Sequence, residues 1–313
     1  MKKILAVAIL CAIAPQAAHA AKSFDKVATV GGQFLKMGVG ARATGMGSSF
    51  VAVADDASAV FWNPAGISRL SGSIASVNHA VWPTDISLTH AAYIFNVGFM
   101  PGMFAVQAKS LYMSDMERTT VYHPDGDGTF FDAGDASFGL TYSRSLTDKF
   151  SAGVTASFVH SGLDDISDNV LAFDFGTLYD TGFRSLRIGM SIQNIGGEFV
   201  YIDSNRGAKV PTVFRVGGSM TVLDSGNNSF LLAGEFSHPP DNSERINLGG
   251  EYSFKDFVFA RGGYNFGYDT EKLAAGIGVK FPSSLSTETR FDYSYVDMSE
   301  LGGAHRFSLD IAF

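Results

Sequence analysis

The stretch GVGARATGMG, residues 38–47, has the G-x-G-x-x-A spacing of a turn that cradles the phosphates of a dinucleotide. Such a turn needs a preceding strand, a crossover helix that begins at the glycines, and an acidic residue about twenty positions further on. The short β-like run KVATVGGQFL precedes it, but no crossover helix of adequate length and no series of βα units follows. We therefore expect these small residues to serve close packing, and we predict neither a nucleotide nor any other cofactor.

Acidic residues in two loops raise the question of calcium, whose preferred ligands are carboxylate oxygens. HPDGDGTFFDAGD (123–135) does not fit the calcium-loop pattern, because Thr129 stands at its fifth position and Phe130 where glycine is needed. The favoured interpretation is that these carboxylates are solvent-exposed loop residues without a ligand, and weak calcium binding is the alternative. We therefore predict no metal site. The carboxylates concerned are Asp125, Asp127, Asp132 and Asp135 in this loop, and Asp164, Asp165 and Asp168 in GLDDISDN.

His160 followed by Ser161 has the residue types of a general base and a nucleophile. The pair stands at the end of a predicted strand, and no motif such as G-x-S-x-G surrounds it. We predict no catalytic residue, and we expect a protein that is not an enzyme.

The composition and the first twenty residues indicate an exported chain. MKKILAVAILCAIAPQAAHA has two lysines, an apolar core and a small-residue cleavage site, which is the pattern of a secretory signal peptide. The single cysteine lies within it, so residues 21–313 contain no disulfide and no thiol. The 23 basic residues are outnumbered by 31 acidic ones, and no basic face for a nucleic-acid partner is evident.

Alternation of apolar and polar residues dominates the sequence after residue 72. Period two with one apolar and one polar face predicts strands between two environments, and segments of about ten residues suit tilted strands across a bilayer. Fourteen strands are predicted, at 73–81, 87–97, 101–113, 135–145, 150–160, 170–179, 186–194, 212–221, 229–237, 244–254, 257–266, 272–281, 286–297 and 305–313.

The connections between these segments fall into two classes. The connections 146–149, 224–228, 254–256 and 282–285 are short and would all lie at one end, whereas the two longest, 114–134 and 195–211, lie at the other. Because free backbone groups find no partner in hydrocarbon, the strands must close on themselves. The sequence therefore predicts an all-β, antiparallel transmembrane barrel of about fourteen strands (73–313) in the bacterial outer membrane, surrounded by lipid and lipopolysaccharide.

Residues 21–72 differ in character, being rich in Gly, Ala and Ser, and we predict a helical and loop hatch that plugs the lumen. Its charged residues Arg42, Asp55 and Asp56 have two interpretations: an electrostatic latch to the wall that breaks for passage, or helix capping and solvated lumen polarity. Pro64 bars the α conformation at Asn63 and suits the first turn of a new helix.

Aromatic residues in the long connections also have two interpretations. Tyr122, Phe130, Phe131 and Tyr201 form either an outer-loop surface for a partner or apolar ligand, or part of the interfacial girdle that every barrel needs. The last strand, HRFSLDIAF, ends in phenylalanine and resembles the terminal assembly signal of outer-membrane barrels. The residues of that predicted signal are Phe307, Leu309, Ile311 and Phe313.

The hatch sequence FLKMGVGARATGMGSSFVAVADDASAVFWNPAG resembles the amino-terminal signature of the PorV/PorQ family, within the FadL-like group of outer-membrane barrels. QNIGG (193–197) and VPTVFRVGG (210–218) resemble further segments of that family. The resemblance covers essentially the whole of residues 21–313. The resemblance implies a fourteen-stranded barrel, and it places Asn63, Pro64, Ala65 and Gly66 in the hatch motif.

Three functions follow from the resemblance. A PorV-like protein would be a non-enzymatic component of a type IX secretion system that binds the carboxy-terminal domains of cargo from the translocon and passes them to attachment machinery. A FadL-like protein would instead admit a fatty acid or another hydrophobic small molecule through a gap in the wall. A PorQ-like protein would be a structural assembly partner.

Overall fold

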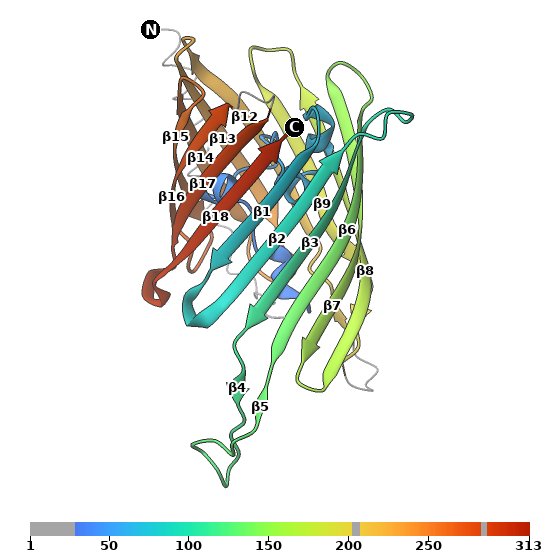
Figure 1. The fold of residues 1–313 in the computed structure, drawn as a ribbon, viewed down its shortest axis with the longest axis vertical. Helices are drawn as coiled ribbons and strands as arrows, with labels where there is room; N and C mark the ends of the chain where they lie inside the picture. The colour runs from blue at the N-terminus through green and yellow to red at the C-terminus, as the bar shows by residue number, and fades with distance from the viewer. Residues whose placement is uncertain (1–28, 202–206, 283–286) are drawn as a thin grey trace.

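Fourteen antiparallel strands close into one barrel in the computed structural model, which describes residues 29–201, 207–282 and 287–313 (Figure 1). Each strand pairs with its neighbours along the chain, and β1 pairs with β18 to close the ring, so the described wall has no open edge in hydrocarbon. The barrel strands are β1 (Ile74–Val81), β2 (Ile86–Phe95), β3 (Met103–Met113), β6 (Ala133–Ser145), β7 (Phe150–Leu163), β8 (Ile166–Asp180), β9 (Arg187–Gly196), β12 (Val213–Asp224), β13 (Asn228–His238), β14 (Arg245–Phe254), β15 (Val258–Phe266), β16 (Leu273–Pro282), β17 (Glu288–Asp297) and β18 (Gly303–Ala312).

Each of the fourteen predicted strands corresponds to one of these, and the fold-class prediction is confirmed. The main differences are β7 and β8, which reach Leu163 and begin at Ile166, and so form a tight hairpin where a longer loop was predicted. Two small sheets inside the long connections were not predicted. They are β4 (Met116–Glu117) with β5 (Phe130–Phe131), and β10 (Glu198–Phe199) with β11 (Ala208–Lys209).

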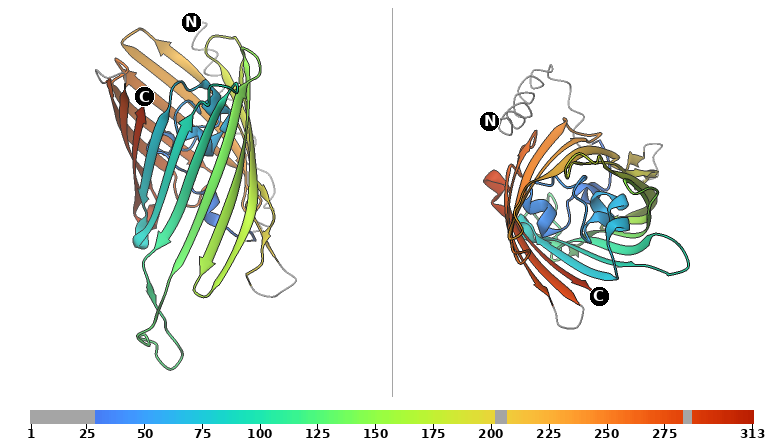
Figure 2. Two further views of the ribbon diagram at one scale, coloured as in Figure 1. Left: turned by 45° about the vertical axis from the view of Figure 1, so that its right-hand side comes forward. Right: turned by 90° about the horizontal axis from the view of Figure 1, so that it is seen from above.

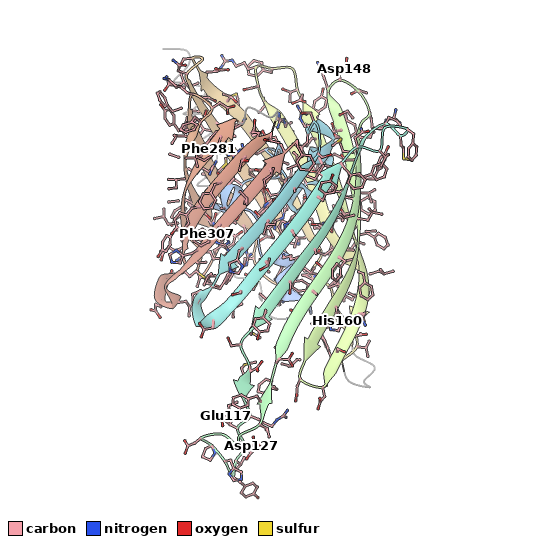
Figure 3. All side chains as sticks on the ribbon, in the orientation of Figure 1. Glu117, Asp127, Asp148, His160, Phe281 and Phe307 are labelled. Carbon is pink, nitrogen blue, oxygen red and sulfur yellow. The ribbon has the colours of Figure 1, made fainter. Side chains whose placement is uncertain are left out.

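The alternating pattern places apolar side chains outside and polar ones inside. In β18, Phe307 and Leu309 are exposed on the outer face, where Figure 3 shows Phe307 pointing away from the barrel, while Arg306 and Ser308 are buried. This reverses the usual arrangement of a soluble protein, and it follows from hydrocarbon outside and a filled lumen inside.

The two longest connections, 114–132 and 197–212, lie at the same end of the barrel, as the sequence predicts, although the two-residue β7–β8 turn lies there as well. The short turns 146–149 and 255–257 lie at the end where the chain terminates, at the top of Figure 1. The longest connection, 114–132, projects from the opposite end with β4 and β5 (Figure 1), and the barrel type identifies that end as extracellular.

Residues 29–72, here called the lumen segment, lie inside the barrel (Figure 2). The segment contains η2 (Gln33–Lys36), α2 (Ala41–Gly45), α3 (Ala59–Trp62) and η3 (Pro64–Arg69), joined by tight turns. Two other single turns, η4 (Pro83–Asp85) and η5 (Ser299–Leu301), lie in strand connections. In the described part of the chain, no helix has the length and apolar character needed to cross a membrane.

The apolar core lies between the lumen segment and the inner wall. Ala59 and Ile67 pack with Ile94 of β2 and Leu178 of β8, and Phe50 and Trp62 form a second cluster on the other side. The predicted signal peptide, residues 1–20, lies outside the described residues.

Candidate functional site: contacts between the lumen segment and the barrel wall

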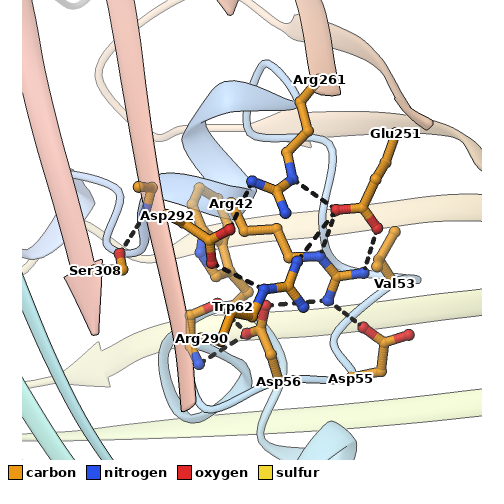
Figure 4. Close-up of polar contacts among 12 residues, drawn as sticks. Arg42, Val53, Asp55, Asp56, Trp62, Glu251, Arg261, Arg290, Asp292 and Ser308 are labelled. Atoms are coloured by element: carbon orange, nitrogen blue, oxygen red, sulfur yellow. Dashed lines mark hydrogen bonds and ion pairs between the residues drawn. The ribbon is translucent and has the colours of Figure 1, made fainter. Parts of the chain in front are cut away.

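Arg42 of α2 is the centre of a buried ion-pair network (Figure 4). Only 7% of the residue is exposed. Its Nη1 lies 2.5 Å from Asp55 Oδ1 and 3.1 Å from Asp56 Oδ2, both in the same segment. Its Nη2 and Nε donate to the two carboxylate oxygens of Glu251 at 2.8 and 2.9 Å, and Glu251 belongs to the wall strand β14. The three predicted hatch charges therefore meet, and Glu251 ties them to the wall.

The network continues around the wall through three strands. Arg261 of β15 donates to Glu251 at 2.6 Å and lies 2.8 Å from Asp292 of β17. Arg290, also of β17, pairs with Asp292 at 2.9 Å. Bidentate guanidinium–carboxylate contacts of this kind are short and directional. Removing one member leaves the others as buried charges without full compensation, which is strongly destabilising.

The charge balance at Arg42 keeps its guanidinium ionised. Burial lowers the pKa of Arg42, but the carboxylates of Asp55, Glu251 and Asp56 raise it by more, so the pKa lies above its ordinary value. Asp56 also accepts from the backbone N–H and the hydroxyl of Ser58, at the start of α3. Both predicted interpretations of these charges therefore have a structural counterpart: Asp56 supports a helix start, and Arg42 joins the segment to the wall.

Glu235 of β13 makes a second connection between wall and segment. Its Oε2 accepts from the backbone N–H groups of Phe50 and Val51 at 3.0 and 2.9 Å. Its Oε1 pairs with Arg215 at 2.7 Å, and the Arg215 guanidinium lies 5.1 Å from the ring centre of Trp62. A carboxylate that accepts two backbone N–H groups holds the chain at a fixed position, because neither donor has water as an alternative.

The family-like segments QNIGG and VPTVFRVGG meet at this second connection. Gln193 accepts from Arg215 Nε at 2.8 Å, and its amide nitrogen donates to the carbonyl of Phe61. Asn194, which has a positive φ of 57°, donates to the carbonyl of Pro211. The two motifs thus hold each other and the lumen segment.

Asn63 fixes the turn between α3 and η3 from a fully buried position. Its side-chain nitrogen donates to the carbonyls of Val51, at 2.8 Å, and Thr177 of the wall, at 3.0 Å. Its side-chain oxygen accepts from the N–H of Ala65, and its extended backbone lets Pro64 open η3. The predicted geometry at Asn63–Pro64 is confirmed, with a 3₁₀ helix as the new element.

Close approach explains the other two residues of the motif. Ala65 presents its carbonyl to the Ser143 hydroxyl of β6 at 3.0 Å. A Cβ at Gly66 would collide with the carbonyl of Ala54 within the segment.

Glycines of the inner wall let the lumen segment touch the strand backbones. A Cβ added at any of six inward positions would lie under 3.0 Å from an atom of the segment, on strands β7, β8, β9, β12, β14 and β15. The small residues of GVGARATGMG meet this wall, and Gly47 packs on Gly263. The six positions are Gly153, Gly176, Gly189, Gly217, Gly249 and Gly263.

The predicted outer aromatic surface is divided between two places. Tyr122 and Phe130 are 90% and 60% exposed on the projecting connection 114–132, where Phe131 lies beside the Arg118 guanidinium. Figure 3 labels Glu117 and Asp127 on this connection. Tyr201 instead stacks on Phe199 and donates to the Ser161 hydroxyl at 2.9 Å, so it packs against the barrel.

The predicted assembly residues lie along one face of β18. Phe307, Leu309, Ile311 and Phe313 are all exposed on the outer surface of the barrel. Phe313 also exchanges two backbone hydrogen bonds with Ser73, which joins the end of the chain to the start of β1.

Three of the residues considered for metal or hydrolytic chemistry have side-chain partners elsewhere in the structure. His160 bonds the side chain of Asn169, Asp127 accepts from Thr129, and Asp164 pairs with Arg118. In residues 29–201, 207–282 and 287–313, no three His, Cys, Asp or Glu side chains are grouped as metal ligands.

Sequence reasoning missed the wall residues that hold the segment. The signal available was a charged or amide residue at an inward position of a strand, between glycines or serines, as in NLGGEYS around Glu251 and LAGEFS around Glu235. The wall residues that it would have indicated are Gln193, Arg215, Glu235, Glu251, Arg261 and Asp292.

The comparison with solved structures identifies the fold. The toluene transporter TodX of Pseudomonas putida is 10% identical with a TM-score of 0.60, and the toluene transporter TbuX of Ralstonia pickettii is 14% identical with a TM-score of 0.59. The monoaromatic hydrocarbon channel CymD is 12% identical with a TM-score of 0.58. Each match covers 88% of this chain and 97 or 98% of the other.

The sequence itself identifies the family. No curated protein matches the chain. The family model described as the type IX secretion system protein PorV matches residues 20–238. This range includes the lumen segment, the strands from β1 to β13 and the wall carboxylate Glu235, whereas Glu251 of β14 lies beyond it. On this match, the chain belongs to the PorV family, with the fold of the FadL/TodX outer-membrane barrels.

Proposed function

We propose that this protein is a non-enzymatic outer-membrane component of a type IX secretion system. In this role it receives the carboxy-terminal domains of secreted cargo from the translocon and passes them to the machinery that attaches them at the surface. The observation that carries the proposal is the PorV family match over residues 20–238. A structural role of the PorQ kind, as an assembly partner only, is the third option.

The lumen segment supports a role that does not use the lumen as a permanent channel. We propose that it is the hatch, with a domain boundary near residue 72. Buried contacts from Arg42 to Glu251, and from Phe50 and Val51 to Glu235, hold it on the neighbouring wall strands β14 and β13. Cargo would then be met by the extracellular surface.

The projecting connection 114–132 is the surface that we propose for partner contact. It carries Tyr122 and Phe130, which are both exposed. Glu117 and Asp127 of the same connection lie beyond the end of the barrel in Figure 3. Exposed aromatic residues are enriched where proteins bind one another. Tyr201 is not part of this surface, because its ring and hydroxyl are already engaged.

Hydrophobic uptake is the second candidate function, and the β8–β9 ladder is the observation that favours it. The pairing shifts register between Phe173 and Phe175, and β12 pairs with β9 only from Arg187 to Gln193. Such an irregularity is where a lateral opening for a hydrophobic compound would form. By contrast, β3 pairs with β6 without a break from Met103 to Tyr112.

One purification separates these functions. The tagged protein is isolated from its native outer membrane in mild detergent, and bound proteins and lipids are identified together by mass spectrometry. Co-purifying translocon or cargo carboxy-terminal domains are expected. A lone barrel with a stoichiometric apolar molecule would contradict the secretion role and support uptake.

A paired variant tests the contact surface. Tyr122→Ser with Phe130→Ser is expected to reduce co-purified cargo several-fold while the barrel still folds. The matched control is Phe99→Ala, which removes an exposed aromatic ring from the turn 96–102 at the other end of the barrel. Equal cargo recovery with all variants would contradict the proposed surface.

A further inference from the structure

A cavity of about 230 Å³ lies between the lumen segment and the extracellular connections of the barrel. Its outer lining includes Trp82 before η4, Pro239 after β13 and Tyr268 after β15, while Met37 and Thr44 line it from the segment. Because one water occupies about 30 Å³ of liquid, the space suits a small molecule of several heavy atoms.

Arg306 of β18 is the buried cation of this cavity. It is 4% exposed, and no group in the described residues accepts a hydrogen bond from its Nε or Nη1. Its nearest carboxylate is Glu271, at 4.0 Å from Nη2, and its guanidinium stacks 5.2 Å from the ring centre of Trp82. A buried guanidinium whose donors lack acceptors is costly, so this arrangement calls for an acceptor.

Positive charge is in excess around the same space. Lys36 and Arg215 line the cavity, but they are neutralised by Asp241 at 2.7 Å and by Glu235 at 2.7 Å. Arg245 also lines it and stacks on Tyr268 at 4.2 Å, with no carboxylate paired to it among the described residues. Within the described part of the chain, neither its Nε nor the indole N–H of Trp82 has a hydrogen-bond acceptor.

The remaining lining is partly apolar. Met37, Val213 and Val296 border the cavity together with Pro239. An inorganic oxyanion would fill only part of this space and leave these side chains without contacts. A small organic acid would place its carboxylate at the guanidinium and its hydrocarbon part on the apolar lining, as ligand sites commonly combine the two.

We propose that this cavity is a binding site for a small organic carboxylate, with Arg306 as its anchor and Arg245 as the second cation. The site is independent of the proposed role in secretion. It faces the extracellular end, so a ligand reaches it without displacement of the Arg42 network.

Butyrate is the probe, and the full chain in a non-ionic detergent is the sample. The chain has two tryptophans, Trp62 and Trp82, and both line the cavity, so intrinsic fluorescence reports binding. Saturable butyrate binding is expected. n-Butanol, which has a similar chain without the charge, and inorganic phosphate, which has the charge without the chain, are expected to bind at least tenfold more weakly.

Arg306→Gln is expected to weaken butyrate binding by about tenfold or more, the loss typical of one charged hydrogen bond. Arg245→Gln serves as the second variant and is expected to weaken it less. The matched control, Arg118→Gln, removes an arginine of the projecting connection and is expected to leave the affinity unchanged. Heat-modifiable migration on gels checks that each variant folds.

Four outcomes would overturn the proposal. The first is the absence of a saturable butyrate response in the wild type, and the second is a butyrate affinity in Arg306→Gln and Arg245→Gln equal to that of the wild type. The other two are n-butanol binding as tight as butyrate binding, and phosphate binding tighter than butyrate binding.

Discussion

At the scale of single residues, the lumen segment is held by a few buried polar contacts. Arg42 is balanced by carboxylates from both the segment and the wall, and Asn63 satisfies three backbone groups at a turn. Buried groups of this kind contribute little net stability when all are paired, but their loss is expensive, because the remaining partner stays desolvated. Such residues therefore determine whether the segment stays in place.

Glu251→Gln is expected to loosen the lumen segment, because it removes the wall charge that pairs with both Arg42 and Arg261. Breaking one partner of a buried pair costs about 3 kcal/mol. Tryptic cleavage at Arg42 in the detergent-solubilised protein should become faster by well over tenfold. Asp256→Asn, which breaks an exposed pair with Lys280, should leave the cleavage rate unchanged. Slow cleavage in both variants would show that Glu251 does not hold the segment.

Asn63→Ala combined with Pro64→Ala is expected to raise passive leak through the lumen. The change removes the hydrogen bonds to Val51 and Thr177 and the fixed turn that opens η3. Liposome conductance and antibiotic sensitivity measure the leak. Asn96→Ala, which affects a side chain in an exposed turn at the periplasmic end, is the control. Wild-type conductance in the double variant would contradict the hatch assignment.

At the scale of elements, the barrel strands accept the lumen segment through glycines that face inward. A strand normally presents side chains on both faces, so a neighbouring backbone stays several ångströms away. A glycine removes this barrier and permits close backbone approach. Six strands use one glycine each in this way, so the short elements α2 and η3 need no long helical faces to pack.

Gly263→Ala is expected to displace the turn after α2. Its Cβ would lie within 2.5 Å of Gly47, where backbone rather than a flexible side chain blocks it. Gly262→Ala is a control on the adjacent residue, because that Cβ faces outward and meets nothing within 4 Å. Conductance in planar bilayers should increase for Gly263→Ala alone. The same conductance for both variants would mean that this contact does not close the lumen.

At the scale of the whole molecule, closure is the property on which the rest depends. The last strand, β18, pairs with β17 and with β1, so the ring is completed only when the end of the chain is in place. Phe313 bonds Ser73 through its backbone and stacks on Tyr93 of β2 at 6.3 Å. An incomplete final strand would leave β1 with free N–H and C=O groups in hydrocarbon.

Deletion of Phe313 is therefore expected to lower the amount of assembled barrel several-fold, and Phe313→Ala is expected to have a smaller effect. The heat-modifiable band in outer-membrane fractions measures the folded fraction. Phe99→Ala removes an exposed aromatic residue of a turn and should assemble normally. Wild-type levels of folded protein after the deletion would rule out Phe313 as part of the assembly signal.

The sequence alone determined the barrel, because the environment of each strand residue, lipid or lumen, sets whether that residue is apolar or polar. The pattern is therefore visible among residues that are neighbours in sequence. Each strand residue faces either lipid or the lumen. The alternation of Phe307, Leu309 and Ile311 with Arg306, Ser308 and Asp310 shows this within six consecutive residues. The lengths of the turns and loops indicated which end of the barrel is extracellular. The motif at Asn63–Pro64 likewise follows from local backbone sterics.

Only the tertiary structure decided what the inward residues contact. Arg42 and Glu251 are 209 positions apart, and Phe50 and Glu235 are 185 apart, so no local pattern pairs them. The sequence also could not show that Tyr122 and Phe130 are exposed on the projecting connection while Tyr201 packs against the barrel. The sequence likewise could not indicate the cavity arginines, Arg245 and Arg306. Their burial and their lack of hydrogen-bond acceptors among the described residues arise only when distant strands surround the same space.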